Sequence, residues 1–156
     1  MLVESGAVNG IANRILPTST TTRAGSVYMT IFAVGALFFY GEKDPDVSIL
    51  DDRIQIKSMY GLNIDFFEFA NIYLIEKSMS DIGIGIRTNG YGGIGRALKG
   101  NFKSDTLGET LLFVQSGSSP TIKMERTDKK DVYISFRNSE STEQLYHELI
   151  ANIPLK

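Results

Sequence analysis

The chain has 156 residues, 42% of them hydrophobic, which suits one domain of ordinary size with a real core and excludes two large domains. Sixteen basic and eighteen acidic residues leave a net charge of -2, so no overall positive field attracts the chain to nucleic acid. The sequence has no cysteine and one histidine, which excludes disulfides and thiolate metal sites and leaves few residues for zinc or histidine-based catalysis.

The first 41 residues divide into a polar part and an apolar part. Residues 1–25 contain a Thr/Ser run with little apolar periodicity, which predicts a flexible N-terminal segment. Residues 26–41, SVYMTIFAVGALFFYG, are uncharged, apolar on every face and aromatic at one end. A membrane span typically needs about 20 apolar residues, and a run of about 10–14 is as often a core helix or a pair of strands.

The abrupt change from aromatic residues to EKDPD after residue 41 favours an interfacial anchor. We therefore expect 26–41 to be a transmembrane helix that makes the protein membrane-associated. The alternative is a segment that packs on the domain, in which case we expect a cytoplasmic protein.

From residue 46 the pattern changes to period-two alternation, which predicts strands. VSILDD and RIQIKSMYG read as a hairpin that turns at Asp51 and Asp52. NIDFFEFANIYLIEK predicts a helical turn around residues 66–70, followed by a strand with Ile72 and Leu74 on one face. Further strands are predicted for IGIGIRT, IGRALKGNFK, ETLLFVQ, TIKMER and VYISF, at a spacing typical of a meander.

The chain ends with a predicted amphipathic helix. Ser141 and Gln144 are spaced as a capping box, and Pro154 ends the helix. The apolar stripe consists of Leu145, Leu149, Ile150 and Ile153. About seven short strands and one helix predict a mainly β fold, a small antiparallel barrel or sandwich with the helix as its cap.

Five stretches of residues 46–153 carry a resemblance to a known family: DVSILDDRIQIKSMYGLNI, FFEFANIYL, RTNGYGGIGRALKGNFK, LLFVQSGSSPTIKM and VYISFRNSESTEQLYHEL. With these stretches the segment resembles a bacterial pleckstrin-homology (PH-like) domain. The resemblance rests on the order of the elements and the placement of glycines. It implies a half-open barrel of two packed sheets with a capping helix. It implies no catalytic residue.

The sequence GYGGIG, residues 90–95, matches the dinucleotide fingerprint GxGxxG. That fingerprint needs a strand, a tight turn and a helix whose N-terminus receives the pyrophosphate. Here the flanking segments alternate with period two, and RALKGNFK offers no long amphipathic helix. The glycines instead fit bends and close backbone approaches in a curved sheet, and Asn89 with Gly90 fits a hairpin turn.

Residues 82–104 carry four basic side chains and no acidic one: Arg87, Arg96, Lys99 and Lys103. Glycine-rich backbone and arginine forks can receive phosphate, so these four are candidate contacts for an anionic lipid headgroup. The alternative is that they are solvated charges that protect a sheet edge. Because alternation puts Lys99 and Lys103 on one face, only some of the four can converge in an unbroken strand.

Other groups indicate no reaction. Asp44, Asp46, Asp51 and Asp52 lack the spacing of a calcium loop and suit turns. His147 lies off the apolar stripe of the predicted helix. We therefore predict no catalytic residue, no metal and no cofactor.

The function predicted from sequence is a non-catalytic PH-like module that binds a protein partner, itself or an anionic headgroup, and does not bind nucleic acid. Two alternatives remain open at this point. One is a nucleotide-binding enzyme that uses the glycine loop 90–95, for which a helix after Gly95 is diagnostic. The other is a purely structural domain for homo-oligomerisation, in which sheet edges pair between copies.

Overall fold

The computed structural model describes residues 20–92 and 95–154, and the side chains of α1 from Val27 onward. The described residues form two units that divide between Val34 and Gly35, and each is described by itself. The predicted flexible segment lies outside the described residues up to position 19. Its last residues already belong to a helix.

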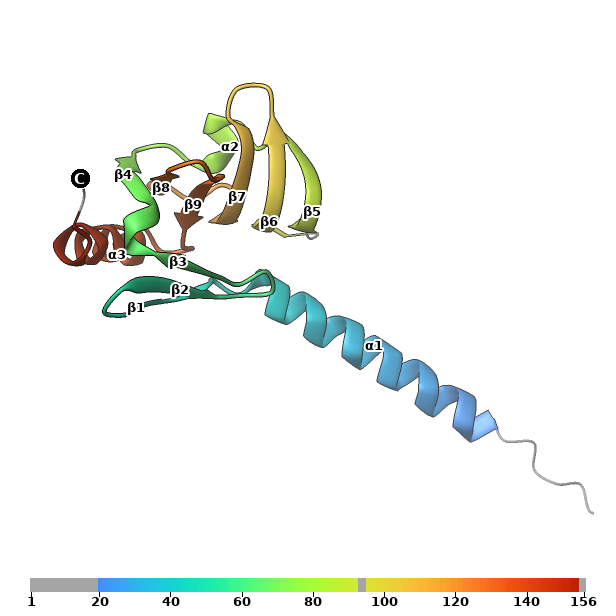
Figure 1. Cartoon of the computed structure of the whole chain (residues 1–156). Helices are drawn as coiled ribbons and strands as arrows, with labels where there is room; N and C mark the ends of the chain where they lie inside the picture. Colours follow the sequence, from blue (N-terminus) through green and yellow to red (C-terminus); the bar gives the residue numbers. More distant parts are fainter. Residues whose placement is uncertain (1–19, 93–94, 155–156) are drawn as a thin grey trace, which may run out of the picture. The chain divides into compact units, whose positions relative to one another are not determined.

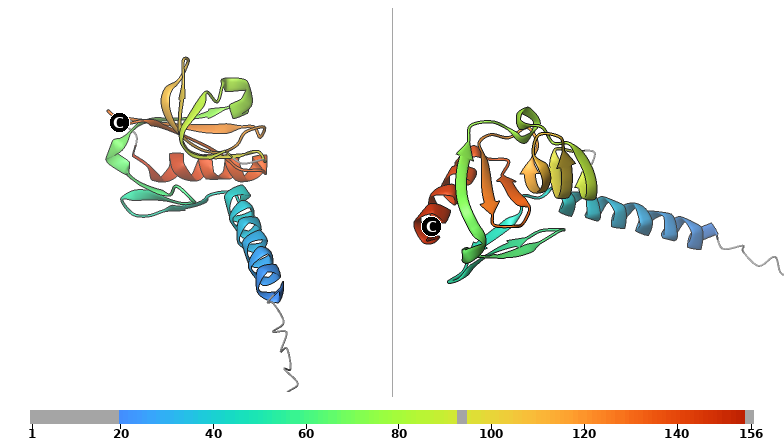
Figure 2. Two further views of the ribbon diagram at one scale, coloured as in Figure 1. Left: turned by 90° about the vertical axis from the view of Figure 1, so that its right-hand side faces the viewer. Right: turned by 45° about the horizontal axis from the view of Figure 1, so that its top comes forward.

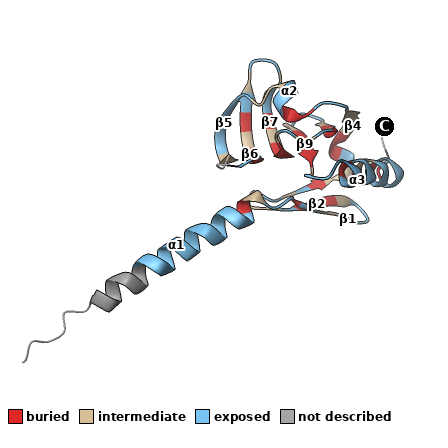
Figure 3. Cartoon of the chain, turned by 180° about the vertical axis from the view of Figure 1, so that it is seen from behind, coloured by how far each residue is buried: buried red, intermediate tan, exposed pale blue. Residues whose placement is uncertain are grey.

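Helix α1 spans Thr20–Glu42. The sequence permits a helix here because it contains no proline, and Pro45 follows shortly after its end. Between Val27 and Tyr40 every described residue is exposed, so this part of α1 is drawn entirely as exposed (Figure 3). An apolar helix exposed on all faces is not a core element.

Across residues 20–92 and 95–154, the structure contains no helix whose length and apolarity would allow it to cross a membrane. The uncharged stretch of the sequence in α1 lies between Arg23 and Glu42 and is shorter than the about 20 apolar residues that a span typically requires. The predicted transmembrane helix at 26–41 is therefore wrong, as is the membrane location based on it.

The first sheet is a three-stranded antiparallel sheet with the order β1-β2-β3 (Figure 1). Its strands are β1 (Asp46–Ile49), β2 (Arg53–Lys57) and β3 (Leu62–Asp65). The alternation in RIQIK buries Ile54 and Ile56, which share a face with Ile64. The predicted hairpin at Asp51 and Asp52 is confirmed by the pairing of Ile49 with Ile54.

The second sheet has six strands in the order β4-β8-β9-β7-β6-β5. These are β4 (Phe69–Ile75), β5 (Ile86–Gly92), β6 (Ala97–Ser104), β7 (Gly108–Gln115), β8 (Thr121–Arg126) and β9 (Asp131–Ser135). The described helices after α1 are the short 3-10 helix η1 (Phe66–Glu68), α2 (Met79–Ile82) and α3 (Ser139–Asn152).

Strand β9 lies between β7 and β8 and pairs in parallel with β7. In a meander, β8 would pair with β7, the strand before it in the sequence. Here β9 lies between them, so the predicted meander is wrong in this region. The burial of Val132, Tyr133 and Ile134 gives the physical reason: three consecutive apolar side chains need cover on both faces, which only an inner strand provides.

The mainly β class with two sheets and one C-terminal helix is confirmed, but the nine described strands do not close into a barrel. Each sheet keeps two edge strands, β1 and β3 in the first and β4 and β5 in the second. The predicted barrel of about seven strands is wrong, because the described strands divide between two separately hydrogen-bonded sheets. Figure 2 shows the two sheets and α3 from two further sides.

The main core lies where the two sheets and α3 meet. Ile54, Ile56 and Ile64 of the first sheet pack in one cluster with second-sheet side chains such as Phe113 and Ile134. Helix α3 adds Leu145, Leu149 and Ile153 to this cluster. Ile150, predicted in the same stripe, is 40% exposed.

The opposite face of the second sheet carries a smaller core. Phe102, Leu112 and Tyr133 pack there with Met79 and Ile82 of α2. Strand alternation sends neighbouring residues of β7 and β9 into opposite cores, so the centre of this sheet is buried on both sides.

Candidate functional site

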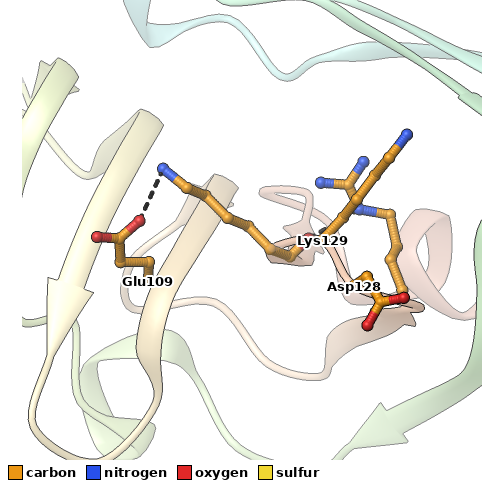
Figure 4. A pocket seen from close by; sticks show the side chains of 5 residues that line it. Glu109, Asp128 and Lys129 are labelled. Carbon is orange, nitrogen blue, oxygen red and sulfur yellow. Dashed lines mark hydrogen bonds and ion pairs between the residues drawn. The ribbon is translucent and has the colours of Figure 1, made fainter.

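A hollow of about 650 Å³ lies beside the turn between β8 and β9. Five side chains line it: Glu109, Arg126, Asp128, Lys129 and Lys130. Glu109 lies on one side of the hollow, and Asp128 and Lys129 lie on the other (Figure 4). Asp128 holds the turn with a φ of 56°, a conformation that Asp tolerates better than most residues.

Each cation of this hollow already has a protein partner. Arg126 Nη1 lies 3.3 Å from Glu68 Oε2, and Lys129 Nζ lies 2.8 Å from Glu68 Oε1. Lys130 Nζ lies 3.1 Å from Glu109 Oε2 and donates to Asn101 Oδ1 at 2.9 Å. A bound anion would have to displace these partners.

The buried part of the network is the Arg126–Glu68 pair, whose side chains are only 6% and 8% exposed. Burial lowers the pKa of Arg126, and the carboxylate of Glu68 acts in the opposite direction. Arg126 Nε also donates to the carbonyl of Lys130 at 2.7 Å. These contacts fasten η1 to the β8–β9 turn, so we assign this hollow a structural role.

A second polar cluster surrounds residues 41–44, which connect α1 to β1 and are called the junction below. Glu42 accepts hydrogen bonds from the hydroxyl of Tyr91 at 3.1 Å and from the backbone N–H of Ala97 at 3.4 Å. Gln115 Nε2 donates to the Glu42 carbonyl at 3.1 Å and to Asp44 Oδ1 at 2.8 Å. The junction is thereby held against β5, β6 and β7.

The start of α3 completes the junction. The backbone N–H of Arg137 donates to Asp44 Oδ2 at 3.1 Å, and Arg137 Nη2 donates to the Glu42 carbonyl at 3.3 Å. Gly41 is buried with the ring of Tyr91 against it, so a Cβ atom there would lie 2.5 Å from that ring. Hydrogen bonds thus hold the junction to the rest of the second unit.

The four basic residues predicted as headgroup contacts are not brought to one surface. Arg87, Arg96 and Lys103 are exposed, whereas Lys99 is only 2% exposed. Arg87 pairs with Phe102 across the strands and therefore points to the opposite face of the sheet from Lys99 and Lys103. Arg87 Nη1 donates to the carbonyl of Gly92 at 3.2 Å.

Lys99 differs from the other three because its ammonium group lies inside the protein. It donates to the carbonyl of Lys43 in the junction. Burial lowers the pKa of Lys99, while the charges of Asp44 and Glu42 raise it. Sequence reasoning placed Lys99 on the surface because β6, ALKGNFKS, carries apolar side chains on both faces and does not identify its core face.

The glycine loop is followed by a strand. β6 begins at Ala97, so the helix that a dinucleotide fingerprint needs after Gly95 is replaced by strand. The strand predicted after the glycines is confirmed as β6, but the strand predicted before them begins only at Ile86 and runs through Gly90 to Gly92, and Ile82 belongs to α2. Asn89 and Gly90 do not form the turn, because they lie inside β5 opposite Asn101 and Gly100.

The remaining candidates lie apart from one another. His147 is exposed on α3 and contacts the ring of Tyr146 edge-on. Within residues 20–92 and 95–154, no group of His, Cys, Asp or Glu side chains could hold a metal ion. Asp51 and Asp52 occupy the β1–β2 turn as predicted, and Asp44 binds Gln115 and Arg137.

Comparison with known proteins gives no relative: no protein family, curated protein or solved structure matches the chain.

The residues that hold the junction were not identified from the sequence. In the sequence, Glu42 is 49 positions from Tyr91 and 73 positions from Gln115, and no local pattern relates these residues. The one signal was Gln115 itself, a polar residue that ends the apolar run LLFV and is buried at 3% exposure. A buried amide requires a hydrogen-bonding partner.

Replacing Gln115 with alanine should lower the free energy of unfolding by about 1–3 kcal/mol, because Asp44 Oδ1 then loses its buried donor. Urea denaturation measures the change. Asn71→Ala is the control, since its amide makes one exposed 3.4 Å bond to Glu125 and should cost little. Equal losses in the two variants would contradict the importance of the junction.

Proposed function

We propose that the protein is a non-catalytic PH-like assembly module whose helix α1 is buried by a second copy of the chain. The observation that carries this proposal is the exposure of ten large apolar side chains on α1. They are Val27, Tyr28, Met29, Ile31, Phe32, Val34, Leu37, Phe38, Phe39 and Tyr40. Contiguous apolar surface of this kind marks an interaction site in a protein that is stable in water.

The amount of surface is sufficient for a specific interface. An aromatic side chain offers about 150–250 Å², so the five aromatic residues, exposed by 40–76%, provide roughly 600 Å². The four aliphatic side chains and Met29 bring the total to at least the about 800 Å² that each partner contributes to a standard interface.

A second copy is a suitable occupant because the apolar stretch has no charge. Residues 24–41 include no Asp, Glu, Lys or Arg, so two copies of this stretch meet without like-charge repulsion. Homo-oligomers are also the commonest assemblies of soluble proteins. The described surface thus favours self-association over a partner with a charged binding face.

The PH-like assignment of residues 46–153 belongs to the same proposal. Two sheets that pack across one core with a C-terminal helix against it are the arrangement that the resemblance implies. The parallel pair β7–β9 is a departure from the antiparallel order expected of that family. The layers therefore support the PH-like proposal, whereas the order of the last strands departs from it.

The test is the mass of the full chain in solution. Sedimentation equilibrium in buffer without detergent should give a multiple of 17.3 kDa. The double variant Phe32→Glu/Phe39→Glu should shift the protein to the monomer, because two buried charges would face each other across the interface. Glutamate is a good helix former, so α1 itself should persist.

Phe67→Glu is the matched control, because Phe67 is an aromatic residue that is 72% exposed outside α1. It should leave the mass unchanged. A wild-type chain that is monomeric in buffer would refute assembly through α1. A chain that dissolves only with detergent micelles, as a monomer, would refute it as well. Dissociation by Phe67→Glu to the same extent would place the interface elsewhere.

A further inference from the structure

A hollow of about 240 Å³ lies beside the junction. It is formed by the end of α1, the junction, the start of β1, the β2–β3 turn and β6. Its volume is several times the about 30 Å³ that a water molecule occupies in the liquid. Three lysines line it: Lys43, Lys57 and Lys99.

Lys99 brings a charge into this hollow that the protein does not neutralise by an ion pair. None of the ion pairs among the described residues includes Lys99, and its described hydrogen bond goes to the neutral carbonyl of Lys43. An ammonium group has three donors, so two are left for other acceptors. A buried cation with so few partners is costly unless an acceptor reaches it.

Ser58, in the β2–β3 turn, also lines the hollow and carries a second unsatisfied group. Its hydroxyl oxygen is buried and is the only such side-chain atom, among the described residues that are not exposed, with no hydrogen-bond partner. Buried hydroxyl groups in proteins nearly always have a partner. Two residues that line the hollow therefore have donors to spare, the ammonium of Lys99 and the hydroxyl of Ser58.

The two carboxylates at this hollow do not satisfy those donors. Both oxygens of Asp44 already accept hydrogen bonds, from Gln115 and from the backbone of Arg137. Asp46 is exposed. Among the lining residues, three lysines against two carboxylates leave a positive charge, and Glu42, outside the lining, attracts Lys99 as well. The described residues include no group of ligands for a metal ion.

We propose that this hollow binds a small oxyanion, a phosphate or a carboxylate, to which Lys99 Nζ and Ser58 Oγ both donate. The exposed lysines at positions 43 and 57 add favourable charge at the entrance. Charge-assisted hydrogen bonds of this kind are about twice as strong as neutral ones. Unlike the predicted headgroup contacts, this site uses only one of the four basic residues from 82–104.

The experiment is calorimetric titration of the full chain with inorganic phosphate and, separately, with acetate, at constant ionic strength. Saturable binding of either anion supports the site, and the tighter of the two identifies the ligand class. Ser58→Ala should bind about tenfold more weakly, since one hydrogen bond to a charged group is lost. Without ligand, its melting temperature should be unchanged or higher, because Ser58 Oγ has no protein partner to lose.

Lys99→Met should abolish binding, and Lys103→Met is its matched control on the same face of β6, where Lys103 is exposed. Lys103→Met should bind as the wild type does. Because Lys99→Met removes a structural hydrogen bond and could unfold the protein, Ser58→Ala remains the deciding variant. The proposal fails if neither anion binds saturably, if Ser58→Ala binds like the wild type, or if Lys103→Met loses as much affinity as Lys99→Met.

Discussion

Replacing Glu68 with alanine should lower the free energy of unfolding by about 3–5 kcal/mol, which is the usual cost of removing one partner from a buried ion pair. The Arg126 guanidinium group, 6% exposed, would remain charged inside the protein with the Lys130 carbonyl as its remaining described partner. Lys129 also loses a partner, but it is 51% exposed and can be solvated. Urea denaturation at neutral pH measures the change.

Glu109→Ala is the matched control for this prediction. It removes an ion pair with Lys130 from the same hollow, but the two side chains are 53% and 39% exposed, so the cost should be about 0–1 kcal/mol. The double variant Glu68→Met/Arg126→Met should recover most of the loss, because it removes both buried charges and keeps apolar volume. A Glu68→Ala variant as stable as Glu109→Ala would show that water solvates Arg126.

The local elements of this fold were predictable because their signals lie within a few residues. The alternation of Ile54 and Ile56 with polar residues predicted β2, and the glycine-rich stretch predicted strands instead of a nucleotide loop. The start of α3 was predicted too late. Asn138 caps the helix, with its Oδ1 accepting from the backbone N–H of Glu140 at 2.9 Å, so the capping box at Ser141 is not used.

The pairing of distant strands could not be predicted from such local signals. After β8, strand β9 can pair with either edge of β8. Which edge it takes depends on which neighbouring elements bury Val132 and Tyr133. The apolar run VYI was the available signal, since continuous apolar residues favour an inner strand. The spacing of the turns favoured a meander, and the meander was therefore predicted.

The candidate sites depend on distant residues to a still greater extent. Ser58 and Lys99 both line the hollow beside the junction, although neither lies in a motif. An unsatisfied hydroxyl is a property of the folded chain and has no counterpart in the sequence. The exposed apolar surface of α1 was visible in the sequence as an uncharged run, but the run alone did not distinguish a membrane span from an interface.

Replacing Gly100 with alanine should cost roughly 2–6 kcal/mol, from about 1–3 kcal/mol of backbone strain and about 1–3 kcal/mol of steric overlap. Its φ of 115° is one that side chains with a Cβ rarely adopt. A Cβ atom there would lie 2.6 Å from both the Asn89 carbonyl oxygen and the Gly90 Cα atom, and backbone atoms cannot move aside as a flexible side chain can.

Two other glycines make this prediction a graded series. Gly108 has a φ of 68° with no atom within 4 Å of a Cβ, so Gly108→Ala should cost only the strain, about 1–2 kcal/mol. Gly35 lies in α1 with open space around it, so Gly35→Ala should be neutral or stabilising by up to about 1 kcal/mol. The three values follow from urea denaturation of the single variants.

The order of the series decides what the glycines are for. Gly90 and Gly100 pair across β5 and β6, where a Cβ on Gly90 would lie 2.2 Å from the Lys99 carbonyl oxygen. If this close approach of two backbones explains the glycines, Gly100→Ala must be the most destabilising of the three variants. A Gly100→Ala cost no greater than that of Gly108→Ala would mean that the strands separate easily, and the glycines of GYGGIG would need another explanation.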